Sequence, residues 1–541
     1  MEGREGGPGI ISEDQKGGCS MVRCRKGVIL VAVLAAALTA GSPAFAQQPK
    51  YGGTLVVGTV TDIVGLDPHK VMAEISMIVL NHIYERLVDL DEKNMPMPGL
   101  ASKWTVSSDG LVYTFHLRQG VKFHNGRELT AEDVAYTYHR LMDPKTKYPF
   151  VTQVQIIKDI KVIDKYTVQF ALKSPTISLL VFMANPLGTH AIVPKEEVEK
   201  QGGTLTRPVG TGPYKFVEYV PDKHVIIERN KDYRGSNLPT SGTGGMKPAY
   251  LDRIKFVPIK DAAVRSMALK SGDIDLTLRV AWEEIDDFKK DPNIVTYIGP
   301  GLAYVTLMFG VNSSANPFIR QSDFRRAVAH CLDLQELVDG SVFGNSVVNP
   351  SLINVVHPYY SDVHKKGYGK DLKKAKELLK KVGYDGTPVK VGVTKVYLNT
   401  YKTAILVEQM LGEAGIKVQL DVKEWPALLQ DANSGKYDML SYIYSGMTDP
   451  SLVMRHLHSK RNFVGYKNEK LDALVEKAET THDHAARKKL YEQIHEIMLE
   501  DVPLLKLYDH SVAPAARKHV KGFKSMPYSA DYRLWQVWLD K

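Results

Sequence analysis

The sharpest change from hydrophobic to polar positions lies within residues 436–450. Six of the eight residues from Tyr437 to Tyr444 are apolar or aromatic, which predicts a buried strand. The next six residues, Ser-Gly-Met-Thr-Asp-Pro, predict a loop, because glycine frees the backbone and proline cannot continue a strand. In open α/β sheets, small ligands bind at loops that leave the carboxyl ends of strands. We therefore expect this loop to form one side of a ligand cleft.

Strand and helix patterns alternate on the amino-terminal side of this stretch. Residues 389–393 and 416–422 alternate as strands, and residues 401–414 between them have helical periodicity. Pro426 opens a further helix before the strand at Tyr437. This β-α-β-α-β order predicts a sheet with parallel neighbours.

The pattern before residue 300 is that of hairpins. Residues 104–117 hold a Ser-Asp-Gly turn between two alternating stretches, and residues 160–172 predict a second hairpin. Thr130 is placed to cap a helix that ends at Met142. With 541 residues the chain is long enough for two or three lobes, each with its own hydrophobic core, and the change of pattern near residue 300 predicts a boundary there.

The amino terminus predicts export. A basic segment, 11 apolar residues over 28–38 and an Ala-Phe-Ala sequence ending at Ala46 follow one another. Eleven residues fit the apolar region of a signal peptide (about 7–15) and fall short of the roughly 20 that span a bilayer. We expect residues 1–46 to be a leader whose natural start is Met21, cleavage after Ala46, and a periplasmic mature protein.

Charge and cysteine usage narrow the class further. The chain has 70 Lys and Arg against 61 Asp and Glu, a formal charge of +9, and the two signs are interspersed. A nucleic-acid groove needs clustered basic residues, so we expect no nucleic-acid partner. Only Cys331 remains after the leader, which excludes an internal disulfide. Its place on the apolar face of a predicted helix favours burial over reactivity.

The sequence holds no catalytic motif of the G-x-S-x-G, phosphate-loop or H-E-x-x-H kind. Two histidine pairs, His456 with His458 and His482 with His484, are the candidates for a metal site. The first pair would point to opposite faces of a strand, and Asp483 within the second is explained as a helix cap. We favour solvated histidines for both pairs and expect no catalytic residue, metal or cofactor.

Several segments, in this order, resemble the family 5 extracellular solute-binding proteins of ABC importers, the group of dipeptide, oligopeptide, nickel and glutathione receptors. They are GGTLVVGTVTDIVGLDP, LASKWTVSSDGLVYTFHLRQGVKFHNGRELTAEDVAYTYHRLMDP, PVGTGPYKF, FRRAVAHCLDLQELV, AKELLKKVGYDG, YSGMTDPS and NFVGYKNEKLDALVEKA. The resemblance implies a two-lobed α/β periplasmic binding protein of type II, of the large cluster-C kind, with an extra subdomain in the first lobe.

The resemblance also implies limits and partners. Lobe I would hold residues 47–300 and 505–541, with the subdomain inserted around residues 85–205, and lobe II would hold residues 301–504. The lobes would close on one small-molecule or short-peptide ligand, and an inner-membrane ABC permease would recognise the closed form. We expect a monomer.

Candidate ligand contacts follow partly from the pattern and partly from the resemblance. Trp425 and Tyr444 lie at predicted strand ends, where a pocket needs rigid amphipathic walls. Trp425 is equally well explained as the start of the helix that Pro426 begins, and Asp449 is better explained as a turn residue before proline. In peptide-binding members of the family, two segments hold the ligand backbone, which adds to them as a strand. The corresponding residues here are Thr61, Asp62 and Ile63 in the first segment and Tyr444, Ser445, Gly446 and Met447 in the second.

The sequence departs from the dipeptide receptors at the charged anchors. Those receptors place an aspartate three residues before the Asp-Pro pair, where this chain has Gly446. The arginine expected within residues 393–402 is absent, and only Lys395 and Lys402 supply positive charge there. Tyr444 stands where the family has a tryptophan. A dipeptide, an oligopeptide, an opine, a sugar and a metal chelate all stay open as ligands.

Two other functions remain as alternatives. A secreted hydrolase would use Asp and His side chains in the cleft between the lobes. A lectin-like or chaperone surface would leave Trp425 and Tyr444 on an open face.

Overall fold

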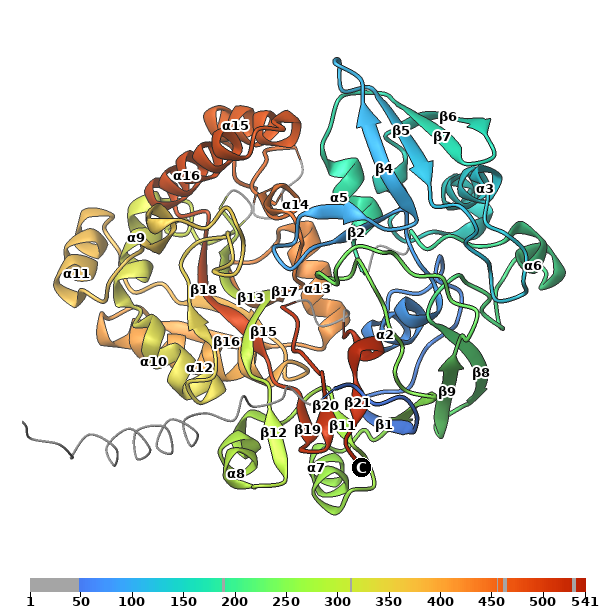
Figure 1. The fold of residues 1–541 in the computed structure, drawn as a ribbon. Helices are drawn as coiled ribbons and strands as arrows, with labels where there is room; N and C mark the ends of the chain where they lie inside the picture. The colour runs from blue at the N-terminus through green and yellow to red at the C-terminus, as the bar shows by residue number, and fades with distance from the viewer. Residues whose placement is uncertain (1–47, 187–189, 312–313, 455, 461–464, 528–531) are drawn as a thin grey trace, which may run out of the picture. The chain divides into compact units, whose positions relative to one another are not determined.

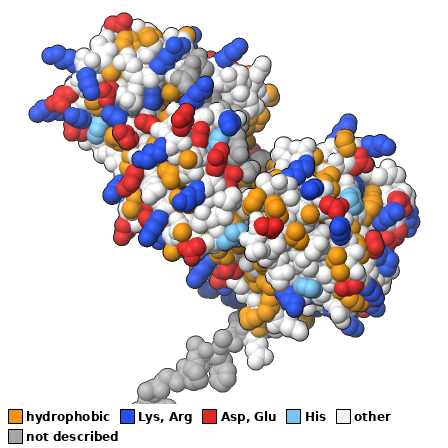
Figure 2. Space-filling view, turned by 90° about the horizontal axis from the view of Figure 1, so that it is seen from above, with side chains coloured by type: hydrophobic (Ala, Val, Ile, Leu, Met, Phe, Trp, Pro, Cys, Tyr) orange, Lys and Arg blue, Asp and Glu red, His pale blue; other side chains and the backbone are white. Residues whose placement is uncertain are grey.

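The computed structural model describes residues 48–541 apart from 187–189, 312–313, 455, 461–464 and 528–531 (Figure 1). The predicted leader, with its start at Met21 and its cleavage after Ala46, lies outside these residues. Among the described helices, none has the length and apolar character needed to cross a bilayer. On the face shown in Figure 2, Lys and Arg side chains are interspersed with Asp and Glu, as the sequence pattern indicates.

A seven-stranded sheet forms the base of the first lobe, which we call lobe I. Its order is β12-β19-β11-β1-β10-β9-β8, and β1 runs parallel to both β10 and β11. Alternate residues of β1, including Leu55 and Val57, are buried in one core with Ile254 and Phe256 of β10. The strands are β1 (Thr54–Thr59), β8 (Tyr214–Val220), β9 (His224–Arg229), β10 (Arg253–Pro258), β11 (Leu276–Thr277), β12 (Ile294–Thr296) and β19 (Ala515–Arg517).

A four-stranded antiparallel sheet with its own core makes a subdomain of lobe I. Both predicted hairpins are confirmed, as β4 with β5 and β6 with β7, in the order β4-β5-β7-β6. Thr130 caps α3 together with Asp133 in a reciprocal capping box, as its position predicts. The strands are β4 (Ala101–Val106), β5 (Val112–Leu117), β6 (Ile157–Asp164) and β7 (Thr167–Leu172).

Helices and short elements complete lobe I around these two sheets. Nine of the ten residues of α2 are buried, and its first residue, Glu74, is the exception. The helices are α2 (Glu74–Ile83), α3 (Ala131–Met142), α4 (Val151–Val154), α5 (Ser178–Ala184), α6 (Lys195–Lys200), α7 (Ala262–Ser271) and α8 (Ile285–Lys290). Two small pairs of strands are β2 (Val88–Leu90) with β3 (Pro96–Pro98) and β20 (Val520–Lys521) with β21 (Trp538–Leu539).

A six-stranded sheet forms the second lobe, lobe II, in the order β14-β18-β13-β17-β15-β16. The predicted parallel neighbours are confirmed, because β15 runs parallel to both β16 and β17. The strands are β13 (Gly299–Phe309), β14 (Val347–Val348), β15 (Val389–Val393), β16 (Val418–Val422), β17 (Met439–Tyr444) and β18 (Leu504–Val512).

Helices cover both faces of the parallel part of this sheet (Figure 1). On one face Ser441 of β17 donates a hydrogen bond to the Thr400 carbonyl of α12, and on the other Leu428 of α13 packs toward Gly392 of β15. Cys331 is fully buried at the end of α9, as predicted. The helices are α9 (Ser322–Cys331), α10 (Leu334–Val342), α11 (Leu372–Lys381), α12 (Leu398–Glu413), α13 (Trp425–Ser434), α14 (Pro450–Met454), α15 (Glu469–Thr480) and α16 (His484–Asp501).

The chain crosses between the two sheets twice. It leaves the seven-stranded sheet at β12 to enter β13, and it returns from β18 to β19, so the second change of sheet falls at residues 513–514. The lobe limits expected from the sequence, 300/301 and 504/505, fall inside β13 and β18.

Asp509 of β18 ties the two crossings together. Its fully buried carboxylate accepts hydrogen bonds from Asn349 (3.0 Å) and Asn354 (2.8 Å) and forms an ion pair with Lys506. The Asn354 amide also donates to the Leu302 carbonyl of β13 at 3.1 Å. One carboxylate thereby links β18, the segment after β14, and β13.

Asp449 is held in lobe II by a second buried ion pair. Its two carboxylate oxygens each accept a 2.7 Å hydrogen bond from Arg487 of α16, and one oxygen also accepts from Ser451. Burial alone would raise the pKa of this carboxyl, but Arg487 outweighs burial and the pKa is lowered. The pair fixes the turn that follows β17, which is the role the Asp-Pro pattern favours for Asp449.

The Asp449→Asn variant tests this structural role. Removing the charge leaves the Arg487 guanidinium buried without its counterion, so we expect the free energy of unfolding to fall by about 3–5 kcal/mol. Urea unfolding followed by far-ultraviolet circular dichroism measures the change. Asp362→Asn is the matched control, because the Asp362–Lys365 pair is exposed and we expect no measurable loss of stability when it is removed. Equal losses in the two variants would contradict the assignment.

Candidate functional site

Three loops of lobe II begin at the same edge of its sheet. Because β15, β16 and β17 are mutually parallel, their carboxyl ends meet there. Tyr397 follows β15, Trp425 follows β16, and Tyr444 ends β17. This is the edge at which ligands bind in open α/β sheets.

The aromatic side chains at this edge touch in series, and we call Tyr397, Trp425, Tyr442 and Tyr444 the aromatic wall. The rings of Tyr397 and Trp425 meet edge to face at 4.9 Å, and Trp425 stacks on Tyr442 at 5.5 Å. The Tyr442 and Tyr444 rings are 5.0 Å apart, and Tyr304 of β13 stacks behind Tyr444 at 5.4 Å. Side chains packed in this way have few rotamers left, so the wall is rigid before any ligand arrives.

The wall carries no charge at physiological pH. Burial raises the pKa of Tyr442 to about 12 and also raises the pKa of Tyr444. The Tyr444 hydroxyl points to the Met308 sulfur at 3.5 Å. Tyr397, Trp425 and Tyr444 are half-buried while Tyr442 is 8% exposed, so three of the four rings keep part of their surface exposed. Such a surface suits apolar side chains and planar amide groups and cannot neutralise an ionic group.

Trp425 has the helix-start role that the sequence left open, and its contact with a ligand stays a prediction. It is the first residue of α13, with Pro426 beside it and Glu424 as an N-cap that forms no side-chain capping bond. Its indole nevertheless bridges Tyr397 and Tyr442 in the wall. Because Trp425 is the first residue of α13, the helix fixes the backbone position of its indole ring.

The loop after β17 is pressed against β13 at Gly446. A Cβ atom on this residue would lie 2.4 Å from the Leu302 Cβ and 2.9 Å from the Ala303 nitrogen, which is closer than real contacts allow. The aspartate of the dipeptide receptors therefore has no room here with this backbone. Ser445 is exposed. Met447 of lobe II packs against Val181 and Phe182 of α5, which belongs to the subdomain of lobe I.

The predicted contacts of lobe I lie in the loop after β1. Thr61 is exposed and Ile63 is buried in the lobe I core. Asp62 is half-buried and accepts hydrogen bonds from the Tyr219 hydroxyl (2.9 Å) and the Asp222 amide (2.7 Å). Its carboxylate thus ties the β8–β9 hairpin to this loop, and their contact with a ligand stays a prediction.

A charged pair at the carboxyl edge of the lobe I sheet was missed from the sequence. Arg279 follows β11 and its Nη2 donates to Glu74, the first residue of α2, at 3.2 Å. Because β1 and β11 are parallel, the loops that lead to these two side chains leave the same edge. The signal was weak because β11 has only two residues and shows no alternation.

The predicted solvation of the histidines is wrong for His458, and His456 is half-buried with its ring 4.8 Å from that of Tyr444. His458 is 1% exposed and pairs with Glu476 at 3.1 Å, because α15 packs over it. His482 and His484 are exposed, and Asp483 caps α16 by accepting from Ala486. Within the described part of the chain, no three His, Cys, Asp or Glu side chains are grouped so as to hold a metal ion.

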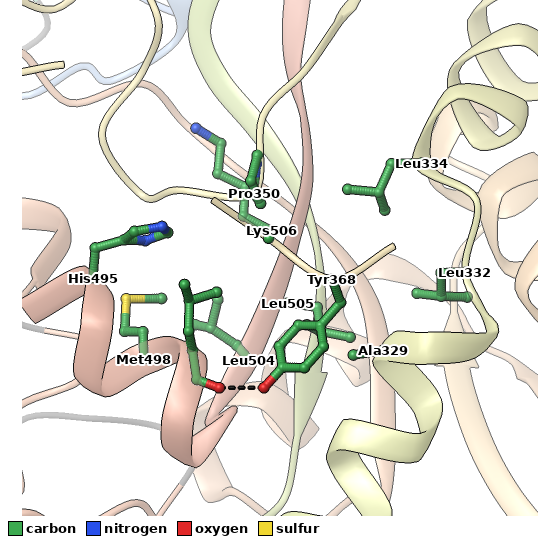
Figure 3. Close-up of a pocket in the computed structure, with 12 residues that line it drawn as sticks. Ala329, Leu332, Leu334, Pro350, Tyr368, His495, Met498, Leu504, Leu505 and Lys506 are labelled. Atoms are coloured by element: carbon green, nitrogen blue, oxygen red, sulfur yellow. Dashed lines mark hydrogen bonds between the residues drawn. The ribbon is translucent and has the colours of Figure 1, made fainter. Parts of the chain in front are cut away.

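A small apolar cavity lies inside lobe II, away from the aromatic wall. It is lined by side chains such as Leu334, Tyr368 and Met498, with His495 and Lys506 at its polar side (Figure 3). The Tyr368 hydroxyl donates across it to the Leu499 carbonyl. Lys506 is committed to Asp509, so this cavity belongs to the packing of the crossing strands.

Comparison with known proteins agrees with this architecture. The model of the bacterial extracellular solute-binding proteins, family 5, matches residues 95–464, more than half of the chain. Di/tripeptide-binding protein 1 of Pseudomonas aeruginosa (strain UCBPP-PA14) is 28% identical, over 93% of this chain and 96% of its own length.

Two solved structures show the same two-lobed fold with different solutes. The periplasmic binding protein DppA of Helicobacter pylori, in complex with the peptide STSA, is 29% identical with a TM-score of 0.74, over 91% of this chain and 99% of its own. AgaA from A. tumefaciens R10, in complex with agropinic acid, is 27% identical with a TM-score of 0.73, over 90% and 99%. The fold therefore identifies a binding protein without naming its ligand.

Gly446→Ala tests how closely the loop must approach β13. The added methyl group would meet Leu302 and Ala303, so β17 and β13 must separate or the loop must shift. We expect a loss of about 1–3 kcal/mol in unfolding free energy. Gly412→Ala is the control, because its Cβ would meet nothing within 4 Å and α12 favours alanine. If Gly446→Ala is as stable as the control, the close contact does not constrain the loop.

Proposed function

The chain belongs to the bacterial extracellular solute-binding proteins of family 5, and from this premise we propose that it binds short peptides between its two lobes and delivers them to an inner-membrane ABC permease. The aromatic wall is the observation that carries the proposal. A rigid, uncharged surface of Tyr397, Trp425 and Tyr444 at a strand-end edge suits apolar side chains and amide planes.

The loop beside the wall supports a peptide held through its backbone. The segment from Ser445 to Met447 continues β17 without forming a strand pair of its own, so its main-chain groups are in position to add a ligand strand. Thr61 and Ile63 of lobe I are the proposed contacts from the other side. Because Gly446 leaves no room for an acidic anchor, the ligand's ammonium group is not fixed at this position and peptides longer than two residues are admitted.

Contacts between the lobes support capture by closure. Lys402 of α12 forms a 2.7 Å ion pair with Glu283, which precedes α8 in lobe I. At the subdomain, the Ile177 amide donates to the Glu479 carbonyl of α15 at 3.2 Å. Closure of this kind needs few residues to move when two strands alone connect the lobes. We propose that the ligand adds its own contacts to these and so shifts the population toward the closed form.

The amino-terminal pattern supports a proposal about the compartment, and the monomeric state is proposed separately from it. We propose that residues 1–46 direct export, that cleavage follows Ala46, and that the mature chain acts in the periplasm as a monomer. The basic, apolar and small-residue segments in their order support export and cleavage.

Ligand-induced stabilisation tests the peptide proposal. A panel of di-, tri- and tetrapeptides, with sugars and opines as comparison, is screened by thermal unfolding of the mature chain. A ligand at 100 times its dissociation constant adds about 2.7 kcal/mol to the free energy of unfolding. We therefore expect peptides to raise the midpoint temperature of unfolding by several degrees. Trp425→Ala should weaken binding about tenfold or more, whereas Trp104→Phe, on β4 of the subdomain, should leave it unchanged.

The alternatives give distinct results in the same experiment. Peptide released from the protein by denaturation and identified by mass spectrometry should be intact. Recovery of cleaved peptide would support the hydrolase instead. A folded protein that responds to sugars or opines and to no peptide would overturn the proposed ligand class.

A further inference from the structure

Two lobe II cations near the wall, Lys402 and Lys423, are already held in ion pairs. Lys402 is paired with Glu283 at 2.7 Å, and its ammonium group lies 4.8 Å from the Phe343 ring centroid. Lys395 lies over the Tyr401 ring at 5.3 Å. The wall itself is neutral, and Lys395 is an exposed side chain on a flexible stem, so a cation with a fixed base would hold a ligand carboxylate better.

Arg279 of lobe I is placed at the binding edge by a fixed backbone. Its carbonyl accepts hydrogen bonds from the Arg265 guanidinium at 3.3 and 3.4 Å and from the Thr277 hydroxyl at 3.3 Å. Arg265 is itself buried and also bonded to the Ile259 carbonyl at 2.7 Å. The loop that carries Arg279 is therefore held on both sides, and its side chain is presented from a rigid base.

The guanidinium of Arg279 has donors to spare. Among the described residues its ion pair is with Glu74, through Nη2, while 57% of the side chain is exposed. The fork geometry of arginine lets its other edge hold a second carboxylate in a bidentate pair. Glu74 keeps the group charged and oriented without enclosing it.

Lobe II packs against the segment that carries this arginine. Trp282, three residues on, meets the His510 ring of β18 edge to face at 5.6 Å, and Glu283 pairs with Lys402 of α12. Glu74 is the largest cause that raises the pKa of Arg279, with smaller contributions from Tyr532 and Tyr397. His510 of β18 also lies close, and burial together with Arg279 lowers the pKa of His510 to about 4. At neutral pH His510 is therefore uncharged, and it cannot substitute for Arg279 as a cation.

We propose that Arg279 binds a carboxylate of the ligand while the ligand's apolar part rests on the aromatic wall. The solute class is then a peptide with a free carboxylate, its anion held by lobe I and its side chains by Tyr397, Trp425 and Tyr444 of lobe II. This inference rests on the proposed peptide-binding function. It adds the direction in which the peptide is bound, with its carboxylate toward lobe I. A ligand that joins Arg279 to the wall bridges the two lobes, so the same contact that selects the carboxylate favours closure.

Paired ligands isolate this contact. Peptides of two to four residues with one Phe or Tyr are prepared as free acids and as carboxyl-terminal amides, and their dissociation constants are measured by calorimetry. A charge-assisted bond to arginine predicts that the wild-type protein binds the acid about tenfold or more tightly than the amide. In Arg279→Gln, the affinity for the free acid should fall to that for the amide, while the affinity for the amide stays unchanged. Arg279→Lys should restore part of the preference for the acid.

Lys395→Gln is the matched control, because it removes a cation from the stretch where the dipeptide receptors have their arginine. We expect it to keep the wild-type ratio of acid to amide affinity. An equal affinity of wild type for both forms, or a ratio that Arg279→Gln leaves intact, would overturn the inference while the peptide function stands. Binding of neither form by the folded protein would overturn both.

Discussion

The buried carboxylate of Asp509 is the constraint on which the geometry between the lobes depends. It is fully enclosed, and it is satisfied only while Lys506, Asn349 and Asn354 keep their places around it. Because Asn354 also holds the Leu302 carbonyl of β13, both crossings are fixed to each other at the point where the chain passes between sheets. A buried charge left without its partners is strongly destabilising, so the local contacts of Asp509 are expected to persist when the lobes move.

The position of the ligand site follows from that junction. Leu302 is the residue against which Gly446 packs, and Tyr304, two residues on, stacks behind Tyr444. The segment that Asp509 fixes is thus the backing of the aromatic wall. The two sheets present opposite chemistry at their carboxyl edges, with uncharged rings on lobe II and the Arg279–Glu74 pair on lobe I. A solute that is apolar along its length and anionic at one end satisfies both.

Local patterns predicted what depends on neighbours in sequence. The strand at residues 437–444, the parallel order around it, the two hairpins and the Thr130 cap each rest on contacts within a few residues or on regular alternation. Family resemblance supplied the two lobes. The burial of His458 under α15 was not predictable, since no local pattern shows which helix will cover a side chain. The role of Arg279 was not predicted for a similar reason. The strand before it has two residues and shows no periodicity, and Glu74, the ion-pair partner of Arg279, lies 205 positions away.

The space around Gly446 shows what a sequence comparison alone leaves out. The absence of an aspartate there could be taken as loss of one ligand contact, whereas the structure makes it a packing requirement set by Leu302. The same holds for Asp449, whose carboxylate is bound to Arg487. Residues that stand at family binding positions therefore divide here into those that support the loop and those, such as Tyr444, that offer surface to a ligand.

The central claim, that a peptide rests on the aromatic wall, is tested most directly by the accessibility of Trp425. Acrylamide quenching of tryptophan fluorescence is measured for the wild-type protein and for Trp425→Phe, and their difference isolates this indole. With a saturating peptide we expect quenching of the Trp425 component to fall sharply, by more than that of the signal that Trp425→Phe retains. Unchanged quenching of Trp425 in a protein shown by calorimetry to have bound its peptide would contradict the account.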